Sequence, residues 1–186
     1  MSEIKEIIKG CLAGSRRDQE LLYRRNAAKL YAVCLQYSGN NEEARDILQE
    51  GFIKIFENLG SYKHEGSFEG WMRRITVNTA LEKFRSRSTL YRVDDIDQLT
   101  DTDAEPDNND YTGLEAADLL EIIRELPPKY RLVFNLYAIE GYSHKEISEM
   151  INISEGTSKS NLSRARAILQ RRVGSYTGIT KRIAYE

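Results

Sequence analysis

Apolar residues recur at helical spacing along the first half of the chain and predict four amphipathic helices. The apolar stripe of the first helix consists of Ile4, Ile7, Ile8, Cys11 and Leu12, and it ends at Gly14. Longer helices are predicted from about residue 18 to 37, from 41 to 59 and from 68 to about 86. Ser38-Gly39 stops the second helix, and Ser67 is the expected cap of the fourth.

Two further helix starts, separated by a very short turn, lie between residues 142 and 166. Ser143 and Glu146 form a capping-box pattern at the start of a short helix with one apolar face. Asn152-Ile153-Ser154 interrupts that pattern, and Ser154 is predicted to cap a second helix that ends near Arg172. This arrangement predicts a helix-turn-helix.

The second of these helices has an apolar side and a polar side. Leu162, Ala165 and Leu169 fall on the apolar side. The other side carries hydroxyl groups and cations, on Lys159, Ser160, Ser163, Arg164 and Arg166. Glu155 is the only acidic residue between the start of the helix and Arg172. Such a face suits a DNA major groove, and an ordinary helical hairpin with solvated charges is the alternative.

Composition limits the size and setting of the protein. With 186 residues, 40% hydrophobic residues and three prolines, the chain can form one medium domain or two small ones. It contains no apolar run long enough to span a bilayer and no signal-peptide core, so we expect a cytoplasmic protein without direct membrane insertion. Cys11 and Cys34 lack the spacing of a metal site or a disulfide framework, and we expect no metal.

Charged residues are segregated along the chain. From Val93 to Glu121 there are eleven acidic residues and no Lys or Arg, whereas the flanking segments are rich in cations. Residues 93–112 have too few apolar side chains to offset the entropy of ordering them, which predicts a flexible acidic linker. The predicted fold is therefore all-α, with two small helical domains joined by this linker. We expect the domains at residues 1–92 and 113–174, with a tail at 175–186.

One loop carries candidate chemistry for nucleic-acid binding. Tyr62, Lys63 and His64 lie between two glycines, directly before a helix with several cations. An aromatic ring, a cation and an imidazole together suit an unstacked nucleobase.

Enzymatic motifs are missing from the sequence. His64 and His144 are the two histidines, and neither accompanies a Cys or carboxylate cluster at metal spacing, so both are expected at the surface. No Gly-rich phosphate loop or nucleophile elbow is present. The sequence predicts a protein that is not an enzyme and needs no cofactor. A purely structural or protein-interaction module is a further alternative to a DNA-binding protein.

The order of these segments resembles the extracytoplasmic-function (ECF) class of sigma factors, the smallest members of the sigma-70 family. The matching segments are Glu42–Leu59, Ser67–Arg87 and Leu126–Leu169. The resemblance implies a sigma factor that binds core RNA polymerase, at the beta-prime clamp helices and the beta flap, and directs promoter recognition, DNA melting and transcription initiation. Promoter DNA and an anti-sigma factor are the other implied partners. The runner-up function is a stand-alone helix-turn-helix transcriptional regulator.

The resemblance also implies roles for individual residues. It assigns core-polymerase binding to Asp46, Gln49 and Glu50. It assigns minus-ten binding to Tyr62, Lys63, His64, Arg73, Arg74, Asn78, Lys83 and Arg85, with the loop capturing a flipped base and the helix cations contacting phosphates. It assigns minus-thirty-five binding to Thr157, Lys159, Ser160, Ser163, Arg164 and Arg166.

Three residues depart from the pattern. Ser158 stands where the family most often has valine, and we expect it to loosen the packing of the helix-turn-helix. Asn161 stands where the family most often has arginine, so the minus-thirty-five sequence cannot be copied from other members. Gly51 lies inside a predicted helix, where glycine costs up to about 1 kcal/mol relative to alanine.

Overall fold

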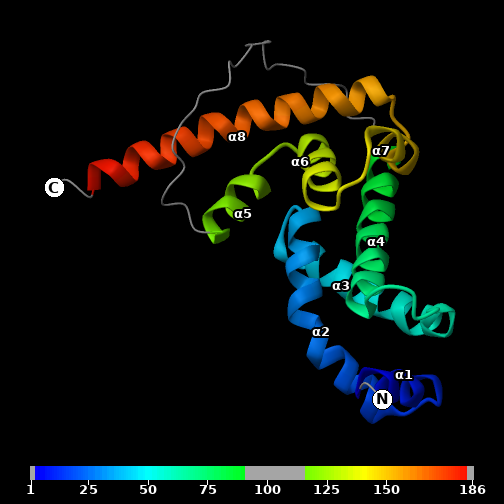
Figure 1. The fold of residues 1–186 in the computed structure, drawn as a ribbon. Coiled ribbons are helices and arrows are strands. Elements are labelled where there is room, and N and C mark those ends of the chain that lie inside the picture. Colours follow the sequence, from blue (N-terminus) through cyan, green and yellow to red (C-terminus); the bar gives the residue numbers. More distant parts are fainter. Residues whose placement is uncertain (1–2, 91–115, 184–186) are drawn as a thin grey trace. The chain divides into compact units, whose positions relative to one another are not determined.

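The computed structural model describes residues 3–90 and 116–183, with side chains over 3–86 and 118–174. All regular secondary structure in these ranges is helical, which confirms the predicted all-α fold (Figure 1). The chain divides into two compact units, Met1–Arg87 (unit 1) and Ser88–Glu186 (unit 2). The predicted linker at residues 93–112 lies outside the described residues.

The described part of unit 1 contains four helices and one short turn. These are α1 (Glu3–Leu12), α2 (Arg16–Tyr37), α3 (Asn41–Asn58), a 3-10 turn at Leu59–Ser61, and α4 (Phe68–Leu90). Figure 1 shows α1 beside the start of α2, and α2 packs along α3. The side chain of Ser15 caps α2 and that of Asn40 caps α3, each by accepting a hydrogen bond from a first-turn amide. α4 continues past the predicted end near residue 86.

The core of unit 1 follows the predicted apolar stripes with one exception. Leu22, Ile47 and Ile55 are almost completely buried at its centre. The inclusion of Leu12 in the buried stripe of α1 is wrong, because this side chain is 58% exposed. Leu12 is the last residue of α1 and lies beside Gly60, which has no side chain to cover it.

Unit 2 is also helical in its described part. Its elements are α5 (Ala116–Arg124), α6 (Pro128–Phe134), a π-helical turn at Asn135–Ile139, α7 (His144–Ile151) and α8 (Glu155–Ile183). Figure 1 shows α5 and α6 along α8, with α7 beside the start of α8. The prediction that the last helix ends near Arg172 is wrong, because α8 runs to Ile183. The helix runs through Gly174 and Gly178, although glycine is a common stop signal.

The described core of unit 2 joins α5 and the residue Leu126 to α8. Ile122, Ile123 and Leu126 pack with Ala165 and Leu169 of α8 in one apolar cluster. Residues 122–126 therefore support α8, the second helix of the helix-turn-helix.

Candidate nucleic-acid interface

The helix-turn-helix of α7 and α8 is defined by its caps. Ser143 and Glu146 form a complete capping box: the Ser143 hydroxyl accepts from the Glu146 amide, and a Glu146 carboxylate oxygen accepts from the Ser143 amide at 2.8 Å. Asn152 ends α7 in the left-handed conformation at φ +54°. The Ser154 hydroxyl then accepts from the Thr157 amide at 3.0 Å and starts α8. These features confirm the caps predicted from the sequence.

α8 presents the predicted minus-thirty-five residues on its outward side. Thr157, Lys159, Ser160, Ser163 and Arg166 are exposed, and Arg164 is half-buried. At 100° per residue, Arg164 and Arg166 lie near opposite edges of this face. One Arg164 guanidinium nitrogen lies 3.4 Å from the Tyr130 hydroxyl. Lys159 lies near the same edge as Arg166, and the middle of the face is formed by the small hydroxyl side chains of Ser160 and Ser163.

Ser158 and Asn161 belong to the buried side of α8. Ser158 is 0% exposed and Asn161 is 8% exposed. The expectation that Ser158 loosens the helix-turn-helix fits this geometry poorly, since its hydroxyl lies 2.9 Å from Nδ1 of His144 and links the first turn of α7 to α8. His144 was expected as a cap-proximal surface residue; it directly follows the Ser143 cap, but its ring is half-buried and stacks on Tyr137 at 4.6 Å between centroids. A hydrogen bond between distant residues leaves no trace in helical periodicity.

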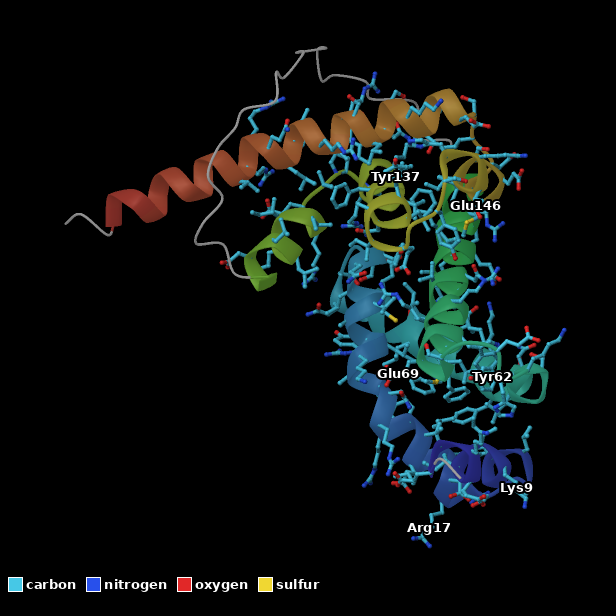
Figure 2. All side chains as sticks on the ribbon, in the orientation of Figure 1. Lys9, Arg17, Tyr62, Glu69, Tyr137 and Glu146 are labelled. Atoms are coloured by element: carbon cyan, nitrogen blue, oxygen red, sulfur yellow. The ribbon has the colours of Figure 1, made fainter. Side chains whose placement is uncertain are left out.

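The loop between α3 and α4 is held by aromatic contacts. The Tyr62 ring lies 4.8 Å from that of His64, 5.0 Å from Phe68 and 5.5 Å from Trp71. Its hydroxyl donates to the carbonyl of Gly66 at 3.0 Å. Tyr62 is therefore anchored at the start of α4 (Figure 2). Lys63 and His64 are exposed.

The predicted minus-ten residues of α4 do not share one face. Arg74, Asn78 and Arg85 are exposed and fall on one stripe of the helix. Arg73 and Lys83 are half-buried and lie on other sides. The sequence identified the cations of this helix but did not separate these two groups.

Lys83 takes part in a cluster of ion pairs between α3 and α4. Glu50 lies 3.4 Å from both Lys54 and Lys83, and Lys54 also pairs with Glu82. Burial is the largest single effect on the pKa of Lys54 and lowers it. The contacts with Glu82 and Glu50 together outweigh burial, so the pKa of Lys54 is raised. Glu50 thus faces α4, away from the middle of the exposed side of α3.

The exposed side of α3 carries the other two predicted polymerase-binding residues. Asp46 and Gln49 are exposed, and Ile53, one turn after Gln49, is 51% exposed. Ile53 was not identified from the sequence. Its helical spacing from Gln49 is the signal that would have found it, because residues four apart share a face.

No other chemistry is apparent among the described residues. They contain no group of three or more His, Cys, Asp or Glu side chains that could hold a metal ion. Cys11 and Cys34 are free and buried, and burial raises the pKa of Cys34 to about 12. Over the same ranges, no helix combines the length and hydropathy of a membrane span.

Family profiles match both units. Sigma-70 region 2 matches residues 22–89, and Sigma-70 region 4 matches residues 116–169. The first range contains the exposed side of α3 and the loop before α4, and the second contains the helix-turn-helix. Both candidate surfaces therefore lie inside the matched ranges.

Individual relatives extend over most of the chain. The ECF RNA polymerase sigma factor SigE of Mycolicibacterium smegmatis is 32% identical over 166 residues, which cover 88% of this chain and 64% of SigE. The ECF RNA polymerase sigma factor SigW of Bacillus subtilis is 31% identical over 156 residues, which cover 78% of this chain and 83% of SigW. Among solved structures, the sigma factor RpoE in complex with the anti-sigma factor NepR from Bartonella quintana matches with a TM-score of 0.49 and 22% identity, over 83% of this chain and 96% of that one.

Proposed function

Because the chain belongs to the ECF RNA polymerase sigma factors of the sigma-70 family, we propose that it binds core RNA polymerase and directs it to promoters. The observation that carries this proposal is the outward face of α8. It presents cations and hydroxyls from a capped helix-turn-helix, and no acidic residue occurs between Gly156 and Arg172. A helix of this kind suits the major groove of duplex DNA.

Minus-thirty-five binding is assigned to unit 2. Ser160 and Ser163 occupy the middle of the α8 face, with Lys159 beside them toward the edge that carries Arg166, and these three side chains would meet base edges. Thr157, Arg164 and Arg166 lie toward its borders, where phosphates flank the groove. Asn161 is buried, so this position adds neither a base contact nor a phosphate contact.

Minus-ten binding and DNA melting are assigned to unit 1. Exposed Lys63 and His64 stand beside the anchored ring of Tyr62, and together they would receive a base extruded from the duplex. Arg74, Asn78 and Arg85 form the exposed stripe of α4 that would follow the strand. Arg73 and Lys83 are assigned a lesser part, because both are half-buried.

Polymerase binding is assigned to the exposed side of α3. Asp46 and Gln49 supply polar contacts, and Ile53 supplies an apolar one that complements them. Glu50 contributes at the edge, where Lys54 and Lys83 already pair with it. Further polymerase contacts at the beta flap would come from unit 2.

The two units together would act as a bridge without catalysing a reaction. Each DNA contact alone is weak, but attachment of both units to one polymerase raises the effective concentration of the second contact. In this arrangement the acidic segment at residues 93–112 is the connection between the units. Family membership further suggests that the protein acts in the cytoplasm, where RNA polymerase is found. It also suggests an anti-sigma factor as a regulatory partner.

The alternative of a stand-alone transcriptional regulator is not favoured. Such a regulator would account for the helix-turn-helix, but not for a region 2 match over residues 22–89.

Run-off transcription with purified core polymerase and a pooled library of host genomic fragments tests the proposal. Transcripts that depend on the added protein are the expected result. Two double variants then serve as controls for each other. Lys159→Ala with Arg164→Ala should weaken promoter binding and leave core binding intact, whereas Asp46→Ala with Gln49→Ala should weaken core binding. The absence of both transcripts and core-polymerase binding would overturn the proposal.

A further inference from the structure

Tyr137 connects the π-helical turn to the DNA-facing side of α8. The turn spans Asn135–Ile139 and is closed by a hydrogen bond from the Glu140 amide to the Asn135 carbonyl at 3.0 Å. π-Helical turns are rare and are frequently found at functional sites. The guanidinium carbon of Arg166 lies over the Tyr137 ring, 5.8 Å from its centroid. Figure 2 shows Tyr137 on the side of the turn that faces α8.

The position of the Tyr137 ring is fixed from the other helix of the motif. His144, the first residue of α7, stacks on it with an angle of 20° between the ring planes. His144 is in turn held by Ser158, whose hydroxyl is buried in α8. Four side chains thus form a continuous path from the interior of the helix-turn-helix to an exposed arginine.

An exposed arginine normally samples many rotamers, and binding a phosphate then costs the entropy of selecting one of them. A cation held over an aromatic face has already lost part of that freedom. Arg166 lies at the edge of the outward face of α8, where a phosphate rather than a base edge is expected. The ring beneath Arg166 is therefore located where pre-ordering of the cation would strengthen DNA binding.

We propose that Tyr137 is a positioning residue for promoter binding, which acts by holding Arg166 ready for a backbone phosphate. This inference rests on the proposed function, in which α8 binds the minus-thirty-five element. It assigns a role to the π-helical turn, which lies outside the DNA-reading helices. The hydroxyl of Tyr137 has no part in the role, because the contact uses the face of the ring.

The simplest competing explanation is that Tyr137 only packs the helix-turn-helix. A packing role would make every contact of α8 weaker when the ring is removed, whatever residue occupies position 166. A positioning role predicts that the loss disappears once Arg166 is gone. A double-mutant cycle separates the two explanations.

The test uses the full chain in holoenzyme and a promoter fragment identified by run-off transcription as the probe. Tyr137→Leu should weaken binding about 2- to 5-fold, the equivalent of one cation–π contact at an exposed site. Tyr137→Phe, which keeps the ring face, should bind as the wild type does. In the Arg166→Ala background Tyr137→Leu should have no further effect, whereas in the Lys159→Ala background its effect should persist in full.

Each other outcome overturns the inference in a distinct way. An equal loss from Tyr137→Leu with and without Arg166 would show a packing role. No loss from Arg166→Ala, when Lys159→Ala weakens binding, would remove Arg166 from the interface and leave the proposed function standing. No loss from any variant would contradict the proposed function itself.

A second measurement does not depend on the folding of Tyr137→Leu. In the free wild-type chain, the Nε–Hε resonance of Arg166 should show a ring-current shift in NMR spectra, and Tyr137→Phe should retain it. A resonance at the position typical of a free arginine would overturn the inference.

Discussion

Gly51 lies in the middle of α3, packed against α4. A Cβ atom added to it would lie 3.5 Å from Oγ1 of Thr76 and 3.8 Å from the Thr76 Cα, both ordinary contact distances. The helix therefore carries the cost of a glycine without strictly needing the space that glycine leaves. We expect Gly51→Ala to stabilise unit 1 by about 0.5 to 1 kcal/mol, because alanine lowers the entropy of the unfolded chain and favours the helix. Thermal or urea unfolding measures this change.

The matched control for this substitution is Gly14→Ala in the same unit. Gly14 has no atom within 4 Å of an added Cβ, but its φ of +79° strains any side chain. Gly14→Ala should therefore destabilise unit 1 by about 1 to 2 kcal/mol. A loss of stability in Gly51→Ala would show that α3 and α4 need a closer approach than the contact distances indicate.

At the same scale, the sequence predicted exposed residues better than buried polar ones. Lys159, Ser160 and Ser163 were correctly placed outside the apolar side of α8, because that prediction needs only the helical period. The contact between Ser158 and His144 was not predicted, because it joins residues from two helices. Which residues meet across a turn depends on the packing angle of the helices, and a one-dimensional pattern does not contain it.

At the scale of the elements, the first turn of α7 is expected to be sensitive to acid. The amide of Ser143, and then its hydroxyl, hold the pKa of Glu146 below its ordinary value of 4.5. A carboxylate whose pKa is lower in the folded than in the unfolded state stabilises the fold in full at any pH above its unfolded-state pKa. This stabilisation is lost as the pH falls through the folded-state pKa. The stabilisation by the capping box is therefore complete above about pH 4.5 and is lost below it.

Glu146→Gln tests this pH dependence, because glutamine keeps the shape of the capping side chain but not its charge. The wild type should melt at a higher temperature than Glu146→Gln above pH 4.5, and the difference should shrink as the pH falls further. Glu149→Gln, an exposed carboxylate on the same helix, is the control. If the difference in melting temperature stays constant down to acidic pH, Glu146 does not act through its charge.

The elements themselves were largely predictable from the sequence, and their ends were less so. Caps at Ser143 and Ser154 fixed the starts of α7 and α8 because capping chemistry is local. The end of α8 was predicted too early, because the helix continues through Gly174 and Gly178 to Ile183. The π-helical turn at Asn135–Ile139 was not predicted, because its sequence has the same apolar character as an ordinary helical turn.

At the scale of the whole molecule, charge along the sequence is informative about organisation. The acidic segment separates two cation-rich parts of the sequence. In the structure, unit 1 ends at Arg87 and unit 2 begins at Ser88. Each unit has a core cluster of its own, one around Leu22 and Ile55 and the other around Ile122 and Ala165. Separate cores would let one unit keep polymerase contacts while the other searches for its DNA element.

Separate cores also predict that damage to one unit spares the other. Leu136 is completely buried in unit 2, and Leu136→Ala should destabilise that unit by about 2 to 5 kcal/mol through lost contacts and a residual cavity. Ile139→Ala, at a 38% exposed position of the same π-helical turn, should change stability by at most about 0.5 kcal/mol. Hydrogen exchange followed by mass spectrometry reports both units in one experiment.

The expected pattern for Leu136→Ala is faster exchange in α6, α7 and α8, with unchanged protection in α2 and α3. Core polymerase binding through Asp46 and Gln49 should then persist while binding to the minus-thirty-five element is lost. Faster exchange across both units would mean that they unfold as one cooperative body. In that case any destabilisation of the helix-turn-helix would also remove the proposed polymerase-binding surface, and substitutions in the cores could not separate the two proposed functions.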